Sequence, residues 1–184
     1  MSKYPNEDPR NDPSNKLMQR VQSGDTAAFE ILVKQNINSS YYFVERMLQN
    51  KALSEDIVQE GFLKVWESRE KWRAEANFKT WLFKMLYNLC IDQIRKQQKS
   101  TILKQTFANN LVNKTNSEQS ARTERNQELL DALATLKPEE KAILFWFYYH
   151  AMPQQNIAEM MDMTISAVES ALYRVRQKLK ENLK

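Results

Sequence analysis

The stretch QQNIAEMMDMTISAVESALYRVRQKL, residues 154–179, contains two short amphipathic segments on either side of a turn. Apolar residues in the second segment recur at spacings of three and four, which is typical of one face of an α-helix. These residues are Val168, Ala171, Leu172, Val175 and Leu179. Asp162 tolerates the left-handed backbone that a tight turn needs, and Thr164 is a suitable N-cap for the second helix. The pattern predicts a helix-turn-helix in which Ile157, Ala158 and Met161 bury the first helix.

The opposite face of the second segment is polar and becomes basic toward the C-terminus. Its residues are Ser166, Glu169, Ser170, Tyr173, Arg174 and Gln177. Such side chains bond to base edges and phosphates in the major groove of DNA. The pattern therefore predicts a DNA-binding segment, with an ordinary helical hairpin that carries a solvated charged face as the alternative.

Composition extends the helical prediction to the whole chain. The 184 residues include only two glycines and five prolines, and three of those prolines, Pro5, Pro9 and Pro13, lie near the start. So few helix breakers favour long helices over a turn-rich β fold. A net charge of +4 and a pI of about 9.1 are compatible with a polyanionic partner.

Hydropathy divides the chain into two helix-rich blocks. We expect a disordered tail over residues 1–16, a helical domain over 17–97, a polar linker over 98–124 and a second helical domain over 125–184. The predicted fold class is therefore all-α, with two small helical domains joined by a flexible linker. The longest apolar run is too short to span a membrane, and no secretion signal opens the chain. The sole cysteine, Cys90, excludes an intrachain disulfide and indicates a reducing compartment.

The segment 78–97 is apolar on nearly every side and carries a single polar stripe. The stripe consists of Thr80, Lys84, Asn88, Asp92 and Lys96, which recur every four residues, with Arg95 beside it. We interpret its basic and amide members as facing DNA, while Asp92 accepts from a base amino group or orients its neighbours. Phe78 and Trp81 are candidates for stacking on unpaired bases. The alternatives are a plain solvated stripe and two core aromatic residues.

Three segments in series carry a family resemblance. They are DIVQEGFLKVWE at 56–67, FKTWLFKMLYNLCIDQIRK at 78–96 and LKPEEKAILFWFYYHAMPQQNIAEMMDMTISAVESALYRVRQKL at 136–179. From Leu17 onward the chain closely resembles bacterial RNA polymerase sigma factors of the sigma-70 family, extracytoplasmic-function (ECF) class. The resemblance implies a sigma-2-like domain, a linker and a sigma-4-like helix-turn-helix domain. It also implies a protein that directs promoter-specific transcription initiation.

The resemblance implies two sites on the first domain. The helix at 56–67 matches the surface that docks core RNA polymerase, through Asp56, Gln59, Glu60, Leu63 and Trp66. The next loop and helix match the region that recognises and opens the minus-10 promoter element. The matching residues are Arg73, Phe78, Trp81, Lys84, Asn88, Asp92, Arg95 and Lys96. A base flipped from the non-template strand is expected to enter a pocket formed by residues 72–77. Gly61 stands where the family more often has a larger residue, and we expect it to let a polymerase helix approach closely.

The helix-turn-helix matches the reader of the minus-35 promoter element. Base or phosphate contacts are expected from Ser166, Glu169, Ser170, Tyr173 and Arg174, with Arg176 and Lys178 along the DNA backbone. The resemblance also implies an anti-sigma factor, often membrane-anchored, that holds the protein inactive. We therefore expect a cytoplasmic protein that reaches the inner membrane only through its anti-sigma factor. Its other expected partners are core RNA polymerase and promoter DNA.

Two other classes of function compete with this one. A stand-alone helix-turn-helix regulator would use the first block for sensing or dimerisation, and it would bind its duplex site without polymerase. An enzyme is disfavoured because the only histidine, His150, adjoins an aromatic run and the sequence holds no recognisable catalytic or phosphate-binding motif. A metal site at Glu55, Asp56 and Glu60 lacks histidine support. The sequence thus predicts no catalytic residue, metal or cofactor.

Overall fold

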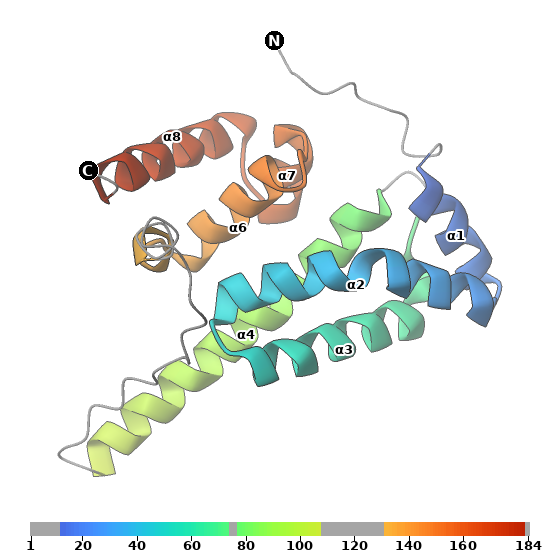
Figure 1. The fold of residues 1–184 in the computed structure, drawn as a ribbon, viewed down its shortest axis with the longest axis horizontal. Helices are drawn as coiled ribbons and strands as arrows, with labels where there is room; N and C mark the ends of the chain where they lie inside the picture. The colour runs from blue at the N-terminus through green and yellow to red at the C-terminus, as the bar shows by residue number, and fades with distance from the viewer. Residues whose placement is uncertain (1–11, 74–76, 108–130, 183–184) are drawn as a thin grey trace, which may run out of the picture.

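The computed structural model describes residues 12–73, 77–107 and 131–182, and all the regular structure in these segments is helical. Figure 1 shows the arrangement. The elements are α1 (Pro13–Gln22), α2 (Thr26–Leu48), α3 (Lys51–Glu67), the 3-10 turn η2 (Arg69–Lys71), α4 (Phe78–Phe107), α6 (Pro138–Tyr148), α7 (Gln154–Met161) and α8 (Ile165–Asn182). Helices α1 to α4 form a first domain and α6 to α8 a second. The predicted all-α, two-domain fold is confirmed.

Short polar side chains fix where the helices of the first domain begin. The Asp25 carboxylate accepts a hydrogen bond from the Ala28 amide at 2.9 Å and so caps the start of α2 at Thr26. The Asn50 side chain accepts from the Leu53 amide at 3.0 Å. Helix α3 therefore starts at Lys51.

Helices α3 and α4 approach each other closely at Gly61. This glycine is buried, and a Cβ atom placed on it would lie 2.5 Å from the Cδ2 atom of Leu86 on α4. Leu86 is itself fully buried, so it has little room to move away. Gly61 therefore serves packing inside the domain, and the expectation that it faces a polymerase helix is wrong.

The second domain contains the predicted helix-turn-helix. Asp162 ends α7 with φ of 52°, in the left-handed region, and the Thr164 hydroxyl accepts from the Ala167 amide at 3.2 Å at the start of α8. The buried face of α8 consists of Val168, Ala171, Leu172 and Val175. On α7 the third buried residue is Met160, whereas the predicted Met161 is only partly buried. The turn, the cap and the apolar seam are otherwise as the sequence predicted.

Two predicted boundaries differ from the structure. Helix α1 begins at Pro13, inside the stretch that we assigned to a disordered tail, because Asp12 caps it with a 2.7 Å bond from the Ser14 amide. Helix α4 continues to Phe107, so residues 98–107 are helical although their composition suggested a linker. The remainder of the predicted tail and linker, residues 1–11 and 108–124, lies outside the described residues. Within the described segments no helix combines the length and apolar character needed to cross a membrane.

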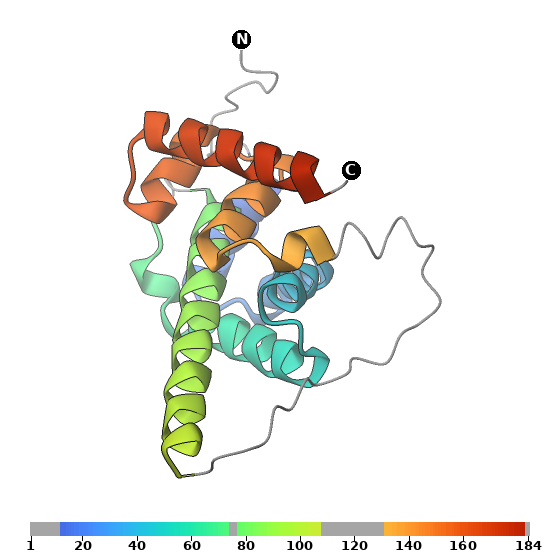
Figure 2. The same cartoon turned by 90° about the vertical axis from the view of Figure 1, so that its left-hand side faces the viewer.

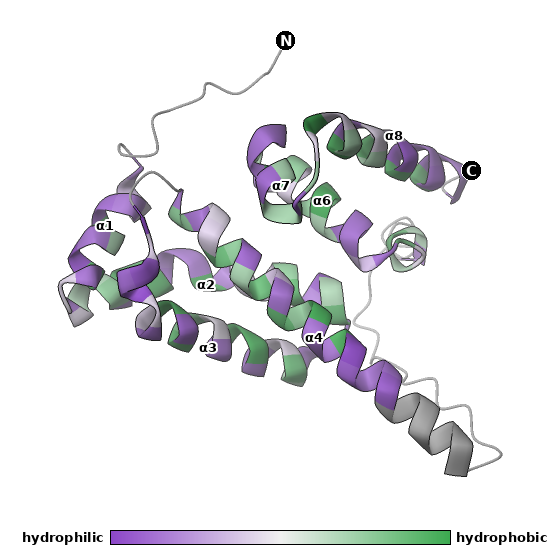
Figure 3. Ribbon diagram, turned by 180° about the vertical axis from the view of Figure 1, so that it is seen from behind, coloured by the Kyte–Doolittle hydropathy of each residue, from purple (hydrophilic) through white to green (hydrophobic). Residues whose placement is uncertain are grey.

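The two domains pack against each other through aromatic rings. Helix α6 lies against α2, and α7 lies near α4 (Figures 1 and 2). The Phe43 ring on α2 lies 5.0 Å from Phe145 and 5.8 Å from Trp146, both on α6. Figure 3 shows apolar residues where the packed helices face one another and polar residues on much of the outer surface. The rings that meet between the two domains form what we call the interdomain aromatic cluster. Its members are Tyr42, Phe43, Phe83, Phe145, Trp146, Tyr149 and His150.

Candidate nucleic-acid and polymerase interfaces

Helix α3 presents one exposed face away from the domain core. Asp56, Gln59, Glu60 and Leu63 follow the three-and-four spacing of a helix face, and all four are exposed. Leu63 is 62% exposed, which is unusual for a leucine in the middle of a helix. Trp66 differs, because its ring packs 5.1 Å from Phe29. An exposed leucine beside carboxylate and amide groups suits a basic, partly apolar partner, with Trp66 contributing at most an edge.

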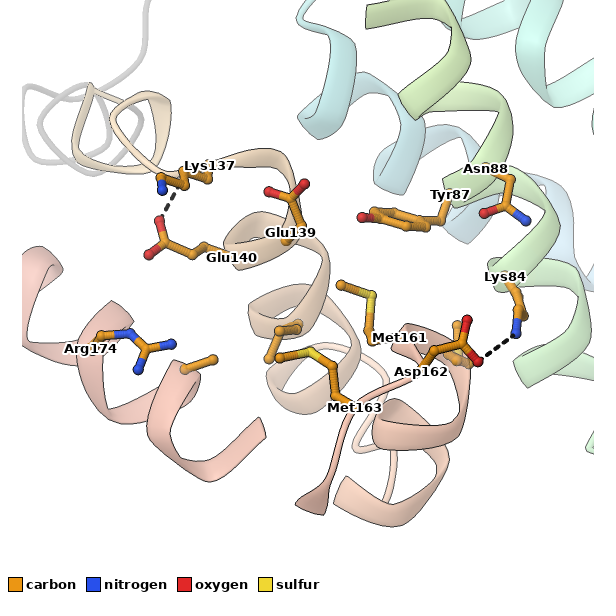
Figure 4. A pocket seen from close by; sticks show the side chains of 13 residues that line it. Lys84, Tyr87, Asn88, Lys137, Glu139, Glu140, Met161, Asp162, Met163 and Arg174 are labelled. Carbon is orange, nitrogen blue, oxygen red and sulfur yellow. Dashed lines mark hydrogen bonds and ion pairs between the residues drawn. The ribbon is translucent and has the colours of Figure 1, made fainter. Parts of the chain in front are cut away.

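The polar stripe of α4 is exposed at its far end and partly covered near its start. Asp92, Arg95 and Lys96 are exposed, and Asp92 lies 3.8 Å from the Arg95 guanidinium. Lys84, which is partly buried, and Asn88, which is exposed, line a cleft of about 490 Å³ between α4 and the second domain. Figure 4 shows Lys84 directed toward the turn after α7, where its Nζ atom lies 4.0 Å from Asp162 Oδ1. In this arrangement part of the predicted minus-10 face is turned toward the other domain.

The cleft carries charges of both signs. Its other charged residues are Lys137, Glu139, Glu140 and Arg174. Tyr87 also lines it, and burial, reinforced by the nearby Glu139 carboxylate, raises the pKa of this tyrosine to about 12. Mixed charge on mostly exposed side chains does not favour one small anionic or cationic ligand. The cleft is a seam between domains rather than a ligand pocket.

Aromatic residues at the start of α4 belong largely to the core. Phe78 is fully buried and Trp72 is 1% exposed, so the prediction that Phe78 stacks on an unpaired base is wrong. Trp81 is partly exposed and its ring centroid lies 6.4 Å from that of Phe78. Arg73 is exposed, with Nη1 donating to the Glu70 carbonyl at 3.2 Å. Of the two candidates for base stacking only Trp81 is accessible, and its role stays a prediction, as does that of the exposed Arg73.

Helix α1 holds both edges of the loop that precedes α4. The Gln22 side-chain amide donates to the carbonyls of Arg69 and Trp72 at 3.1 and 2.9 Å. At the other edge Asn15 Oδ1 accepts from the Phe78 amide at 2.7 Å. We did not predict these contacts. The Asp12-Pro13 pair, a cap followed by a proline at the first helical position, was the available sign that a helix begins here.

Helix α8 exposes the face predicted to read DNA. Ser166, Glu169, Ser170, Tyr173 and Arg174 are all exposed. The neighbours of α8 are α6 and α7, which pack on its apolar side. Tyr173 is 62% exposed, so an aromatic ring stands free in the middle of this polar face. The exposure fits the predicted role, and the DNA contacts themselves stay a prediction.

Two basic residues of α8 are engaged within the second domain. Lys178 Nζ lies 2.6 and 2.9 Å from the two carboxylate oxygens of Glu140 on α6. Arg176 hydrogen-bonds the Tyr148 hydroxyl and lies 5.6 Å from that ring. The interpretation of Lys178 as a backbone contact to DNA is therefore corrected, because its charge already neutralises Glu140. Arg176 is exposed although its guanidinium contacts Tyr148.

Comparison with protein families identifies both domains. The Sigma-70 region 2 model matches residues 32–100, and the Sigma-70 region 4 model matches residues 126–179. The two matches follow the order of the two domains and together cover about two thirds of the chain. The chain belongs to the sigma-70 family. Helix α3 of this sigma factor lies inside the first match, and most of α4 and of α8 lies inside the first and second matches respectively.

Known relatives place this sigma factor in the ECF class. It is 25% identical over 177 residues to the ECF RNA polymerase sigma-E factor of Haemophilus influenzae, covering 91% of this chain and 93% of the relative. It is 23% identical over 182 residues to the ECF sigma factor SigW of Bacillus subtilis, covering 92% and 96%. The similarity therefore extends over nearly the full length of both relatives.

Solved structures share the fold. The sigma factor RpoE of Bartonella quintana, in complex with the anti-sigma factor NepR, aligns with a TM-score of 0.69 at 20% identity, over 84% of this chain and 96% of that one. The protein CnrH, in complex with the cytosolic domain of CnrY, aligns with a TM-score of 0.70 at 19% identity, over 94% and 97%. At this identity the likeness establishes a common fold.

Proposed function

We propose that this sigma factor is an alternative promoter-specificity subunit of bacterial RNA polymerase. It has no catalytic role of its own and supplies core polymerase with recognition and opening of a particular class of promoter. The observation that carries the proposal is the presence of sigma regions 2 and 4 in order on one chain, each with an exposed polar helix face. Full-length similarity to ECF RNA polymerase sigma factors supports it.

The docking surface for core polymerase is the outer face of α3. Its acidic and amide groups surround Leu63, whose exposure leaves apolar area available to a partner. A helical partner with basic residues around an apolar centre would bury Leu63 and pair with Asp56 and Glu60. The placement of this face on the same domain as α4 supports a role in bringing polymerase and promoter together.

The promoter contacts divide between the two domains. Trp81, Arg73 and the exposed part of the α4 stripe read and open the minus-10 element, because stacking and cationic groups stabilise an unstacked strand. The exposed face of α8 reads the minus-35 duplex in the major groove. Arg174 is the strongest candidate for a base contact, since it is exposed and arginine bonds guanine bidentately.

An anti-sigma factor would control this protein. One structural relative is a sigma factor in complex with an anti-sigma factor, and another, CnrH, is in complex with the cytosolic domain of CnrY. Control of this kind would keep the protein in the cytoplasm, close to the inner membrane when the anti-sigma factor is membrane-anchored. The alternative of a stand-alone regulator is not favoured, because it gives no reason for a region 2 domain.

The test is transcription in vitro from a randomised promoter library with sigma-free core RNA polymerase from the cognate species. Discrete transcripts that require the protein, and that share sequence at two spaced upstream elements, are the expected result. Specific duplex binding without polymerase, combined with no stimulated transcription, would instead support the stand-alone regulator. The library also identifies the promoter for the experiments below.

A further inference from the structure

We propose that Asp12, Asn15 and Gln22 of α1 are positioning residues for promoter opening. The proposal rests on the proposed function and adds residues that lie before the region 2 match, which begins at residue 32. These three side chains bond to the two edges of the loop that separates α3 from α4. We call them the α1 clasp.

One end of the clasp holds the turn after α3. Gln22 uses one amide nitrogen to donate to two carbonyl oxygens, those of Arg69 and Trp72, across 47 and 50 residues of sequence. These are the first residue of η2 and the residue that follows it. The Trp72 side chain is buried and its carbonyl oxygen accepts from Gln22, so both its ring and its backbone are fixed. Arg73, the exposed cation of the proposed site, directly follows this anchored position.

The other end of the clasp holds the first turn of α4. The two carboxylate oxygens of Asp12 accept different hydrogen bonds. Oδ1 accepts from the Ser14 amide, and Oδ2 accepts from the Asn77 side chain at 3.0 Å. Asn77 in turn accepts from the Lys79 amide at 2.9 Å and so caps α4. The N-caps of α1 and α4 are therefore joined by a single hydrogen bond. Asn15 adds a second bond, from the Phe78 amide.

Burial makes these bonds effective. Asn15 is fully buried and Asp12 and Gln22 are partly buried, so water competes poorly with the contacts they make. Trp81, the residue proposed to stack on an unpaired base, lies on the first turn of α4, one turn beyond Asn77. Loss of the clasp would let Arg73 and Trp81 move relative to each other. Strand opening is sensitive to this because the gain from a captured base must offset the cost of unstacking it.

The polarity of the Asp12–Asn77 bond allows a swap experiment. In Asn77→Asp the new aspartate still caps α4, but its carboxylate faces the carboxylate of Asp12. In Asp12→Asn the new asparagine still caps α1, but its amide NH₂ group faces the NH₂ group of Asn77. The double variant Asp12→Asn with Asn77→Asp restores one donor and one acceptor. The local caps survive in all three proteins, so only the bond between α1 and α4 changes.

The measurement is open-complex formation by core RNA polymerase with each variant, on a promoter carrying a fluorescent base analogue in the minus-10 element. We expect each single variant to lower the extent of opening roughly fivefold or more, and the double variant to return within about twofold of the wild type. Core binding, measured alongside, should be unchanged in all. A further variant, Gln22→Glu, should also reduce opening, whereas Gln19→Glu on the exposed side of the same helix should not.

The outcomes separate the two proposals. Equal opening by the wild type and both single variants would overturn the clasp and leave the proposed function standing. A loss in the single variants that the swap does not restore would also overturn it, because the residues would not act through each other. Failure of the wild type to open any promoter with cognate core would overturn the proposed function and the clasp together.

Discussion

His150, the only histidine in the chain, lies where the two domains meet. Its ring centroid is 4.2 Å from that of Phe83 on α4 and 5.1 Å from that of Phe145 on α6. The Nε2 atom is buried and makes no hydrogen bond within the described residues. Burial, assisted by the positive charge of Lys79, lowers the pKa of His150 to about 4. The packed state therefore requires the neutral imidazole.

This requirement predicts a pH effect on stability. An unfolded histidine has a pKa of about 6.5, so between pH 6.5 and 4 the unfolded chain binds a proton that the packed state does not. The stability that the neutral ring contributes is present above pH 6.5 and is lost as the pH falls toward 4. From pH 7 to 5 we expect a loss of about 1 kcal/mol, because solvent screening of the partly exposed ring reduces the full effect.

Thermal unfolding of the wild type and of His150→Phe measures this effect. Phenylalanine keeps the aromatic contacts and cannot titrate, so its melting temperature should change little between pH 7 and 5, while that of the wild type falls. Carboxylates with lowered pKa values, such as Asp25, titrate at lower pH and affect both proteins alike. A parallel decline in both proteins would assign the pH dependence to other groups.

At the scale of single helices, α8 carries one cation that we propose contacts DNA, Arg174, and one that pairs within the protein, Lys178. Partial burial alone would raise the pKa of Glu140, but hydrogen bonds from Lys178 and from the Lys137 amide outweigh it, and the pKa is lowered. The ion pair therefore joins the end of α8 to the start of α6. Arg174 lies one turn earlier on the exposed face. Two cations of one helix thus have different surroundings, since Lys178 is paired and Arg174 is exposed.

The prediction for α8 compares Arg174→Ala with Lys178→Ala. We expect Arg174→Ala to lower affinity for the specific minus-35 duplex by about 1–3 kcal/mol and to reduce discrimination against a scrambled duplex. Lys178→Ala should lower the free energy of unfolding by up to about 1 kcal/mol and leave discrimination unchanged. Fluorescence anisotropy of both duplexes with the variant bound to core RNA polymerase, and chemical denaturation of the free protein, provide the two readouts. Reduced affinity for both duplexes in Lys178→Ala, without lost stability, would restore Lys178 as a DNA contact.

Much of the element-scale structure was predictable from local sequence. The three-and-four spacing identified the buried face of α8, and Asp162 and Thr164 marked helix ends through chemistry that acts within a few residues. Composition misled where it was the only guide, because polar residues 98–107 continue the helical register of α4.

The parts of the sites that the sequence did not predict all depend on distant partners. Lys178 pairs with Glu140, 38 residues away, and Gln22 reaches Trp72 across 50 residues. Periodicity shows that a residue lies on a helix face, but not which other element covers that face. Phe78 illustrates the limit, since its position on α4 suited base stacking and its burial against α1 and the core excludes it.

At the scale of the whole molecule, the two domains are too close to occupy both promoter elements. Elements near positions −10 and −35 are about 25 base pairs apart, which is about 85 Å along B-form DNA. In the structure α4 and α7 are in contact and Lys84 pairs with Asp162 across the cleft. Simultaneous recognition therefore requires the domains to separate. The interdomain aromatic cluster is what resists that separation.

Two adjacent tyrosines test this consequence. Tyr149 stacks on Tyr42 of the first domain at 4.9 Å, whereas Tyr148 contacts Arg176 in its own domain, and the two are 56% and 54% exposed. Tyr149→Glu should increase the radius of gyration in small-angle scattering, because a charge replaces a ring in the contact. Tyr148→Glu, equally exposed, should not. Equal scattering curves for both would show that this stack contributes little to holding the domains together.

Gly61 has no side chain, and this allows the close approach of α3 and α4. Helices α3 and α4 approach closely there, so one helix contact sets how the proposed polymerase-facing side chains of α3 lie relative to the proposed promoter-facing side chains of α4. At 1.5 Å per residue, Asp92 to Lys96 lie about 9–15 Å beyond the contact at Leu86. A tilt of α4 caused by one added methyl group at residue 61 would grow into a larger displacement at this distance, and hydrogen bonds tolerate only a few tenths of an ångström. The relative orientation of the two proposed surfaces thus depends on the absence of a Cβ atom at Gly61.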